Sequence, residues 1–185
     1  MSWLLLILGV AIWWGAHLFK RAAPDMRANL GDPGKGIVAV LLIGSIVLMV
    51  IGYRGTEFVS VWYPPSFLVH VNNLLMLVAL YLFSPAAKRG KLIYGMRHPM
   101  LIGFKTWAIA HLLVNGDLAS VILFGGLLAW AVVEVIVINR SEPDWQKPNE
   151  PGTIAKDAMF FVGSVVLLAI IGYVHSWLGV WPFPA

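Results

Sequence analysis

Residues 97–116 read RHPMLIGFKTWAIAHLLVNG and set the plan of the whole chain. Arginine, histidine and proline precede an apolar run that is long enough for a membrane helix. Pro99 suits the first turn of that helix, because its missing N–H needs no partner there. Lys105 follows His98 by two helical turns on nearly the same face. His111 lies about 20 Å beyond His98 along the axis and is rotated from it by about 220°. The helix therefore carries charge near one membrane surface and an imidazole near the other.

The composition is that of a polytopic membrane protein. Of the 185 residues, 59% are hydrophobic and 12% are charged, and the mean hydropathy is +0.81. Soluble domains carry about 25% charged residues. With no cysteine in the chain, disulfides, thiolate metal ligands and cysteine nucleophiles are excluded. The formal net charge of +4 is too small to indicate a nucleic-acid partner.

Six apolar segments alternate with polar connections, and we predict an all-α fold of six transmembrane helices in one bundle. The whole chain, residues 1–185, is expected to form one domain. Five predicted spans are Ser2–Phe19, Gly36–Tyr53, Ser66–Phe83, Leu118–Ile138 and Ala158–Trp177, and the fourth span in chain order runs from Arg97–Pro99 to the turn at Asn115–Asp117. This turn is so short that the helices on either side of it should be antiparallel neighbours.

Lysines and arginines indicate the orientation. The first, third and fifth connections hold nearly all of them, whereas the second contains Arg54 alone and the fourth contains none. By the positive-inside rule the three basic connections are cytoplasmic, so both termini are expected outside. The first span is followed by Lys20–Arg21 and preceded by no basic residue, which is the reverse of a signal peptide. We therefore expect this span to remain as an anchor.

Charged groups at membrane depth cost at least about 2.5–3.5 kcal/mol, so they need a partner or a function. The groups expected toward the cytoplasmic side are His17, Arg97, His98 and Glu134, with Lys105 deeper. Because their helices are antiparallel neighbours, Lys105 and Glu134 come to similar depth. We predict that these two side chains pair. The pair is either an internal ion pair or part of a pocket for an anionic or polar group.

Three further histidines, His70, His111 and His175, are expected near the outer surface. Asn73 follows His70 by about one turn on the same face, and Trp107 precedes His111 by one turn. Histidine is a common ligand of haem and of metal ions, and bundle interiors are where such sites are built. The pattern fits a haem or metal site, and it also fits histidines that only hydrogen-bond within the core. Deeper tryptophans, at Trp13, Trp14, Trp107 and Trp130, could line an apolar cavity.

The run RHPMLIGFKTWAIAHLLVNGDLASVILFGGLLAWAVVE, residues 97–134, closely resembles the NnrU family. The segments GAHLFKRAAPDMRANLGD (15–32) and IGYRG (51–55) extend the resemblance over most of the chain. NnrU-like proteins are bacterial inner-membrane proteins linked to denitrification. The resemblance therefore implies an inner-membrane protein that acts in nitrogen-oxide metabolism as an enzyme or accessory factor.

The NnrU family is in turn similar to 15-cis-zeta-carotene isomerase, a membrane enzyme that uses haem b. This similarity implies haem b here, with its iron held by His17 in GAHLFKR and His111 in WAIAHLL, and it matches His98 to the histidine of the RHP motif. The isomerase has a cysteine near the second ligand, but Ala108 stands three residues before His111 in this chain. A ligand exchange with that thiol is therefore in doubt. On predicted depth alone, His70, His111 and His175 form a better-matched set than His17 with His111.

Arg97–His98–Pro99 followed by Gly103 is also similar to the isoprenylcysteine methyltransferase group, where this segment helps to bind S-adenosylmethionine. Glu134 and Trp145 are possible counterparts of its acidic and aromatic residues, although its paired tyrosines are missing here. Three functions stay open at this point: a haem b-binding NnrU-type protein, a cis–trans isomerase of a polyene such as zeta-carotene, and a cofactor-free assembly or partner-binding protein. The expected partners are the lipid bilayer, a hydrophobic small molecule and another membrane protein, with no nucleic acid.

Overall fold

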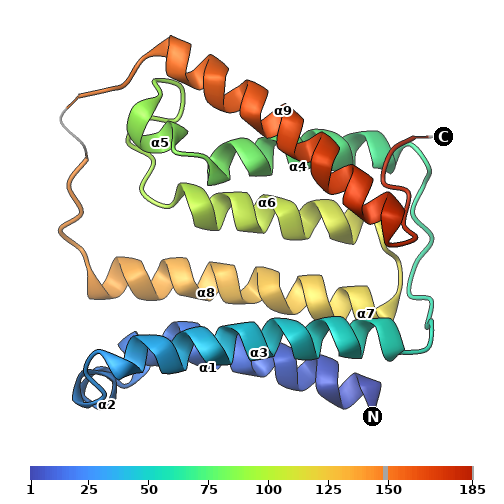
Figure 1. Ribbon diagram of the computed structural model, residues 1–185, viewed down its shortest axis with the longest axis horizontal. Coiled ribbons are helices and arrows are strands. Elements are labelled where there is room, and N and C mark those ends of the chain that lie inside the picture. The colour runs from blue at the N-terminus through green and yellow to red at the C-terminus, as the bar shows by residue number, and fades with distance from the viewer. Residues whose placement is uncertain (148–149, 185) are drawn as a thin grey trace. The chain divides into compact units, whose positions relative to one another are not determined.

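The computed structural model of the chain describes residues 1–147 and 150–184, and in this part of the chain it contains helices and no strand (Figure 1). The all-α fold is therefore confirmed. The helices form two compact units. Unit 1 consists of Met1–Tyr63 and Asn115–Ser141, and unit 2 consists of Pro64–Val114 and the chain from Glu142 onward. The single domain remains a prediction.

Unit 1 is built on an antiparallel hairpin of α1 (Ser2–Ala22) and α3 (Pro33–Gly55), with the short α2 (Pro24–Asn29) between them (Figure 1). The two long helices meet backbone to backbone at glycines. A Cβ atom on Gly9 would lie 2.8 Å from the backbone N of Met49, and one on Gly52 would overlap the backbone of Leu6. Helices in lipid associate largely through such van der Waals contact between small residues.

The third rod of unit 1 combines α7 (Leu118–Ser120), the π-helix η1 (Val121–Gly125) and α8 (Gly126–Ser141). It runs parallel to α1, because Gly126 meets Val10 near one end and Glu134 meets Arg21 near the other. Its start is fixed by Asp117, whose carboxylate accepts hydrogen bonds from the backbone N and the hydroxyl of Ser120. This N-cap lets the helix begin directly after the tight turn that the sequence predicts.

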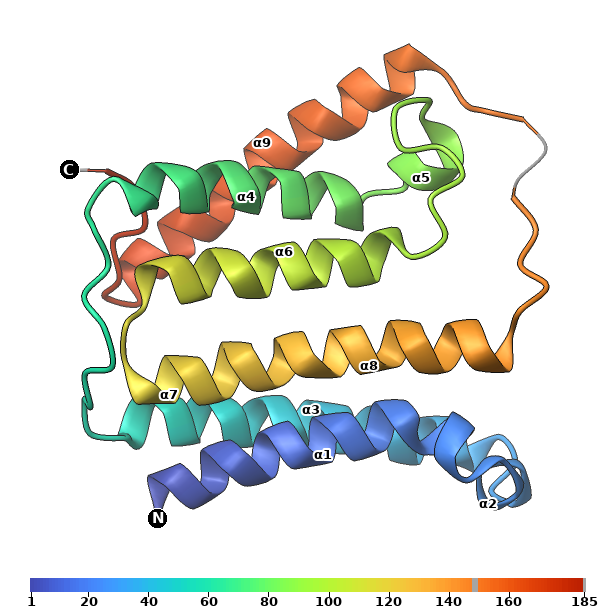
Figure 2. The same ribbon diagram turned by 180° about the vertical axis from the view of Figure 1, so that it is seen from behind.

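Unit 2 contains α4 (Leu68–Phe83), α5 (Ala86–Arg89), α6 (Pro99–Val114) and α9 (Ile154–Trp177) (Figure 2). The helices α4 and α6 are antiparallel and closely packed, and Gly103 lies against the backbone of Ala79. The helix α9 also packs against α4, but α6 and α9 make few contacts with each other. The helix α4 is therefore the common support of this unit.

Four helical segments are long and apolar enough to cross a membrane: α1, α3, Leu118–Ser141 and α9. The helices α4 and α6 have 16 residues each, which gives about 24 Å of helix against a hydrocarbon core of about 30 Å. Prolines shorten both, because Pro65 precedes α4 and Pro99 begins α6. Four of the six predicted spans thus reach full length, and crossing by the other two remains a prediction.

Candidate functional site

In unit 1 the imidazole of His17 lies between two indole rings. Its ring centroid is 4.2 Å from that of Trp13 and 4.4 Å from that of Trp130. Trp13 precedes His17 by one helical turn on α1, so helical spacing alone brings these two side chains together. Trp130 is buried and reaches the imidazole from α8. The sequence marked all three residues but could not show that they form one cluster.

One turn further along both helices, Arg21 and Glu134 form an ion pair. The guanidinium Nη1 donates to Oε1 of Glu134 at 3.0 Å. The sequence predicted Lys105 as the partner of Glu134, whereas the described contact of the carboxylate is with Arg21. The helix α1 packs along α8 within unit 1 and brings Arg21 to the carboxylate. Lys105 lies half-buried on α6 of unit 2, so its pairing with Glu134 remains a prediction.

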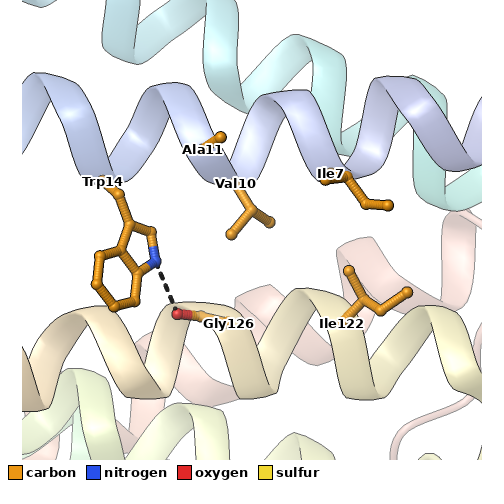
Figure 3. Close-up of a pocket in the computed structure, with 6 residues that line it drawn as sticks. All are labelled: Ile7, Val10, Ala11, Trp14, Ile122 and Gly126. Carbon is orange, nitrogen blue, oxygen red and sulfur yellow. Dashed lines mark hydrogen bonds between the residues drawn. The ribbon is translucent and has the colours of Figure 1, made fainter.

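An apolar pocket of about 490 Å³ lies between α1 and the third rod of unit 1 (Figure 3). Its lining comprises Ile7, Val10, Ala11, Trp14, Ile122 and Gly126. The indole Nε1 of Trp14 donates to the carbonyl of Gly126 at 3.0 Å, so these two polar groups satisfy each other. Ile122 belongs to the π-helix, an element often found at functional sites. The volume suits a small ligand, and the lining suits a hydrocarbon one. The expected role of deeper tryptophans in lining a cavity is confirmed for Trp14.

At one end of unit 2, α4 begins and α6 and α9 finish, and this end carries His70, His111 and His175. We call it the histidine end. His70 is exposed in the first turn of α4, whereas His111 and His175 are half-buried in the last turns of their helices. His111 also packs against Trp107, with 5.0 Å between ring centroids. The three histidines that the sequence placed at one depth thus share one end of unit 2.

The imidazoles of His17, His111 and His175 share one hydrogen-bonding pattern. Each ring lies with Nδ1 at 2.8–3.0 Å from the carbonyl oxygen four residues earlier in its own helix. A carbonyl oxygen only accepts hydrogen bonds, so Nδ1 carries the hydrogen and Nε2 of the neutral ring carries the lone pair. A histidine that ligates a metal typically has its other nitrogen bound in this way. The pattern therefore fits iron ligation through Nε2.

Asn73, which the sequence placed beside His70, is half-buried and accepts a hydrogen bond from Asn72 at 3.0 Å. Asn72 itself is buried, and its Oδ1 has no hydrogen-bond partner within the described part of the chain. Asn72 was not predicted from the sequence, because the helical spacing from His70 points to Asn73 and not to Asn72. The amide pair adds polarity to α4 near the histidine end.

The opposite end of unit 2 is organised by Asp157, which the sequence assigned to the last connection. Its buried carboxylate accepts hydrogen bonds from the hydroxyl of Tyr81 at 2.6 Å and from the backbone N atoms of Lys91 and Leu92 at 2.6 and 3.1 Å. It thereby ties together α4, the segment after α5 and α9. An aspartate next to an apolar run was the available signal, but its partners lie far away in the sequence.

The RHP motif stands just before α6, as predicted. Pro99 is the first residue of the helix, and the carbonyl of His98 accepts a hydrogen bond from the backbone N of Ile102 at 2.9 Å. Arg97 donates to the carbonyl of Glu142. The ammonium of Lys147 lies 4.7 Å above the ring centre of Tyr94. Arg97 thereby helps to hold the chain after α8 in place. A binding pocket around Arg97 and His98 remains a prediction. The last predicted connection also includes residues 148–149, which lie outside the described residues.

Several predicted site residues fall in different units. His17 and Glu134 belong to unit 1, whereas His111 and Lys105 belong to unit 2, so the His17–His111 ligand pair remains a prediction. Within residues 1–147 and 150–184, no three His, Asp or Glu side chains are grouped to hold a metal ion. A haem iron needs only one or two protein ligands, and the imidazoles described above have the right donor atoms for it.

The fold and the apolar helices define an all-helical, multi-pass membrane protein. The model of the NnrU protein family matches residues 5–182, nearly the entire chain, and the chain belongs to this family. The family resemblance predicted from residues 15–32, 51–55 and 97–134 is thereby confirmed. No curated protein matches the chain, and no solved structure matches it.

Proposed function

We propose that this NnrU-family protein binds haem b through histidine and acts in nitrogen-oxide metabolism as an enzyme or accessory factor. The observation that carries the proposal is the shared pattern of the three helix histidines. Each holds Nδ1 against a carbonyl oxygen of its own helix, which favours the tautomer with the lone pair on Nε2, the form of histidine that ligates iron. His111 would be one ligand of the iron, and the family resemblance gives His17 as the second.

The residues present restrict the kind of haem site. With no cysteine in the chain, the protein has no thiolate for the iron. The hydrogen bonds at Nδ1 favour imidazole nitrogen as the ligand of the iron, and imidazole is a typical ligand of b-type haem. When bound, haem would supply an iron that changes between the ferrous and ferric states. The chain's own residues would hold the imidazole rings in orientation, with two indoles beside His17 and one beside His111.

For the membrane arrangement, we propose a protein of the bacterial inner membrane with six crossings and both termini in the periplasm. All lysines and arginines other than Arg54 and Lys105 fall at connections on one predicted side. Four segments have full spanning length. For α4 and α6, local bilayer thinning and basic residues near the helix ends would accommodate a short helix at modest cost.

A second candidate is a cis–trans isomerase of a polyene, and the apolar pocket of unit 1 favours it. The pocket offers about 490 Å³, and its Trp14 and Gly126 polar groups already bind each other. A hydrocarbon chain could bind there without a penalty in free energy from unpaired polar groups, because the two polar groups of the lining keep each other as partners. Extraction of the purified protein with organic solvent, followed by mass spectrometry, would reveal a bound polyene. A lipid extract without one would count against this function.

The haem proposal is tested by an absorption spectrum of protein expressed with ample haem and purified in detergent. We expect a Soret band in the wild type and its loss or shift in His111→Ala that still elutes as a folded species. His98→Ala is the matched control, because it removes a histidine at the other end of α6 and should leave the haem content unchanged. A folded wild type without a Soret band would refute haem binding and leave a cofactor-free assembly or partner-binding role.

A further inference from the structure

We propose that the segment joining α4 to α6 binds the phosphate headgroup of an anionic phospholipid at the cytoplasmic face of the membrane. We call this segment, residues 84–98, the α4–α6 connection. The inference goes beyond haem binding and uses contacts within unit 2 only. Its placement at the cytoplasmic leaflet rests on the proposed membrane arrangement.

The α4–α6 connection carries a positive charge that no acidic residue of the segment balances. It contains Lys88, Arg89, Lys91 and Arg97 and neither aspartate nor glutamate. Lys88, Arg89 and Lys91 are exposed, and none of the three forms an ion pair within residues 1–147 and 150–184. Clustered basic residues next to a membrane helix attract anionic lipid headgroups. The charge of this segment therefore suits a phosphate ligand.

The backbone of the α4–α6 connection is tied to the start of α9. The carboxylate of Asp157 accepts hydrogen bonds from the backbone N atoms of Lys91 and Leu92 at 2.6 and 3.1 Å. The carbonyl of Arg89 accepts another from the backbone N of Thr153 at 3.3 Å. Asp157 thus binds N–H groups of the backbone and leaves the neighbouring cationic side chains unpaired. A segment that is already held in place loses less conformational freedom when a ligand binds.

The lengths of the two helices place the α4–α6 connection at the level of the headgroups. Each helix has 16 residues, about 24 Å against a hydrocarbon core of about 30 Å. Short helices keep the segment that joins them at the membrane surface. Leu92 directly follows Lys91 and is 71% exposed. An exposed apolar side chain beside cations fits a boundary of phosphates and acyl chains, whereas a soluble anion would offer the leucine no contact.

The connection between α1 and α3 provides a contrast on the same predicted side of the membrane. There Lys35 pairs with Asp32 at 2.9 Å, and Arg21 at the end of α1 pairs with Glu134. The positive charge of that connection is thus partly balanced within the protein itself. The α4–α6 connection is therefore the stronger site for an anionic lipid, and the other connection supplies the control.

The test titrates short-chain phosphatidylglycerol into the detergent-purified protein and measures the affinity by thermophoresis, with phosphatidylcholine of the same chain length for comparison. We expect a preference for phosphatidylglycerol that disappears at about 1 M salt, where the Debye length is about 3 Å. Each basic residue near an anionic surface contributes about fivefold in affinity. Lys88→Gln combined with Lys91→Gln should therefore weaken this binding by about 30-fold. The matched pair Lys20→Gln with Lys35→Gln should bind nearly as the wild type does.

Inorganic phosphate is the arm that separates a lipid from a free anion, and it should bind far more weakly than phosphatidylglycerol. Equal affinity for the two lipids, equal effects of the two double variants, or phosphate binding as tight as lipid binding would overturn the assignment. If the Lys88 and Lys91 double variant does not fold, the lipid preference and salt dependence of the wild type still decide. The titration requires neither haem nor a known orientation. A missing Soret band, or labelling of residue 88 from outside, would therefore refute the proposed function or membrane arrangement separately.

Discussion

Glu134 is a buried carboxylate whose negative charge is balanced by one arginine. Its side chain is 7% exposed, and Oε1 contacts Arg21, which is 19% exposed, at 3.0 Å. Oε2 has no hydrogen-bond partner within the described part of the chain. A buried carboxylate held by one cation depends on that cation, because loss of the partner leaves an uncompensated charge in a medium of low polarity.

We therefore predict that Arg21→Gln destabilises the protein more than Glu134→Gln does. Breaking a buried pair from one side costs about 3–5 kcal/mol, and the partial exposure of Arg21 should place its loss toward the lower end of that range. Glu134→Gln removes the charge and keeps the shape, so it should be milder. The double variant should be more stable than Arg21→Gln alone. Thermal unfolding of the detergent-purified proteins measures these differences.

Lys105→Gln provides the matched control for that experiment. If Arg21 alone balances the charge of Glu134, the stability effects of Lys105→Gln and Glu134→Gln should add, because Lys105 then contributes nothing to that carboxylate. Strong coupling between Lys105 and Glu134, with additive effects for Arg21 and Glu134, would restore the pairing expected from the sequence and contradict the observed one.

At the level of residues, the sequence predicted which side chains are unusual but not which of them meet. Glu134, His17 and Trp130 stand out because polar or bulky groups at membrane depth need an explanation. The observed partner of Glu134 comes from α1, more than a hundred positions away in the chain, and the packing of α1 on α8 brings it there. Asp157 was missed for the same reason, since its partners belong to α4 and to the segment after α5.

Among the helices, the close contact of α1 with α3 depends on residues without side chains. A Cβ atom added at Gly52 would overlap the backbone N and Cα of Leu6, and backbone atoms cannot move aside as a flexible side chain can. Gly44 lies on the same helix with nothing within 4 Å of its would-be Cβ. The two glycines therefore form a matched pair for mutation.

We predict that Gly52→Ala separates α1 from α3 and lowers the unfolding temperature, whereas Gly44→Ala does not. In a helix, alanine is intrinsically favoured over glycine by about 1 kcal/mol, so Gly44→Ala should be neutral or slightly stabilising. At Gly52 the steric conflict outweighs that gain, because small residues let these helices approach. Thermal unfolding of both variants in the same detergent is the measurement. Equal stability of the two would show that the close approach at Gly52 contributes nothing.

The long helices were predicted from the sequence to within a few residues, and the local irregularities were not. Continuous apolar runs define α1, α3, the third rod of unit 1 and α9, because the bilayer imposes their length. The short helices α2 and α5 were assigned to loops, since a few polar residues after a span carry little periodicity. The π-helix from Val121 to Gly125 has no such sequence signal, because a single wider turn leaves the apolar pattern almost unchanged.

For the whole molecule, the main question is whether the chain crosses the membrane six times or four. Because the rod that starts at Leu118 runs parallel to α1, it begins on the same side as the N-terminus, so α4 and α6 must either both cross or both fail to cross. If both cross, Lys88, Arg89 and Lys91 are cytoplasmic. If neither crosses, these residues lie outside with Ser60, and three basic side chains would violate the positive-inside rule. The side on which residue 88 lies therefore decides between the two arrangements.

We predict six crossings, with residue 88 in the cytoplasm and both termini in the periplasm. The chain has no cysteine, so one introduced thiol gives an unambiguous signal with a membrane-impermeant maleimide on intact inner-membrane spheroplasts. Ser2→Cys and Ser60→Cys should react from outside. Lys88→Cys should react only after the membrane is opened, as should Ala28→Cys, which serves as the cytoplasmic control in either arrangement. The four positions were chosen because only Lys88→Cys changes side between the models. Labelling of Lys88→Cys from outside, with Ala28→Cys protected, would establish four crossings, and α4 and α6 would then be re-entrant or interfacial helices rather than spans.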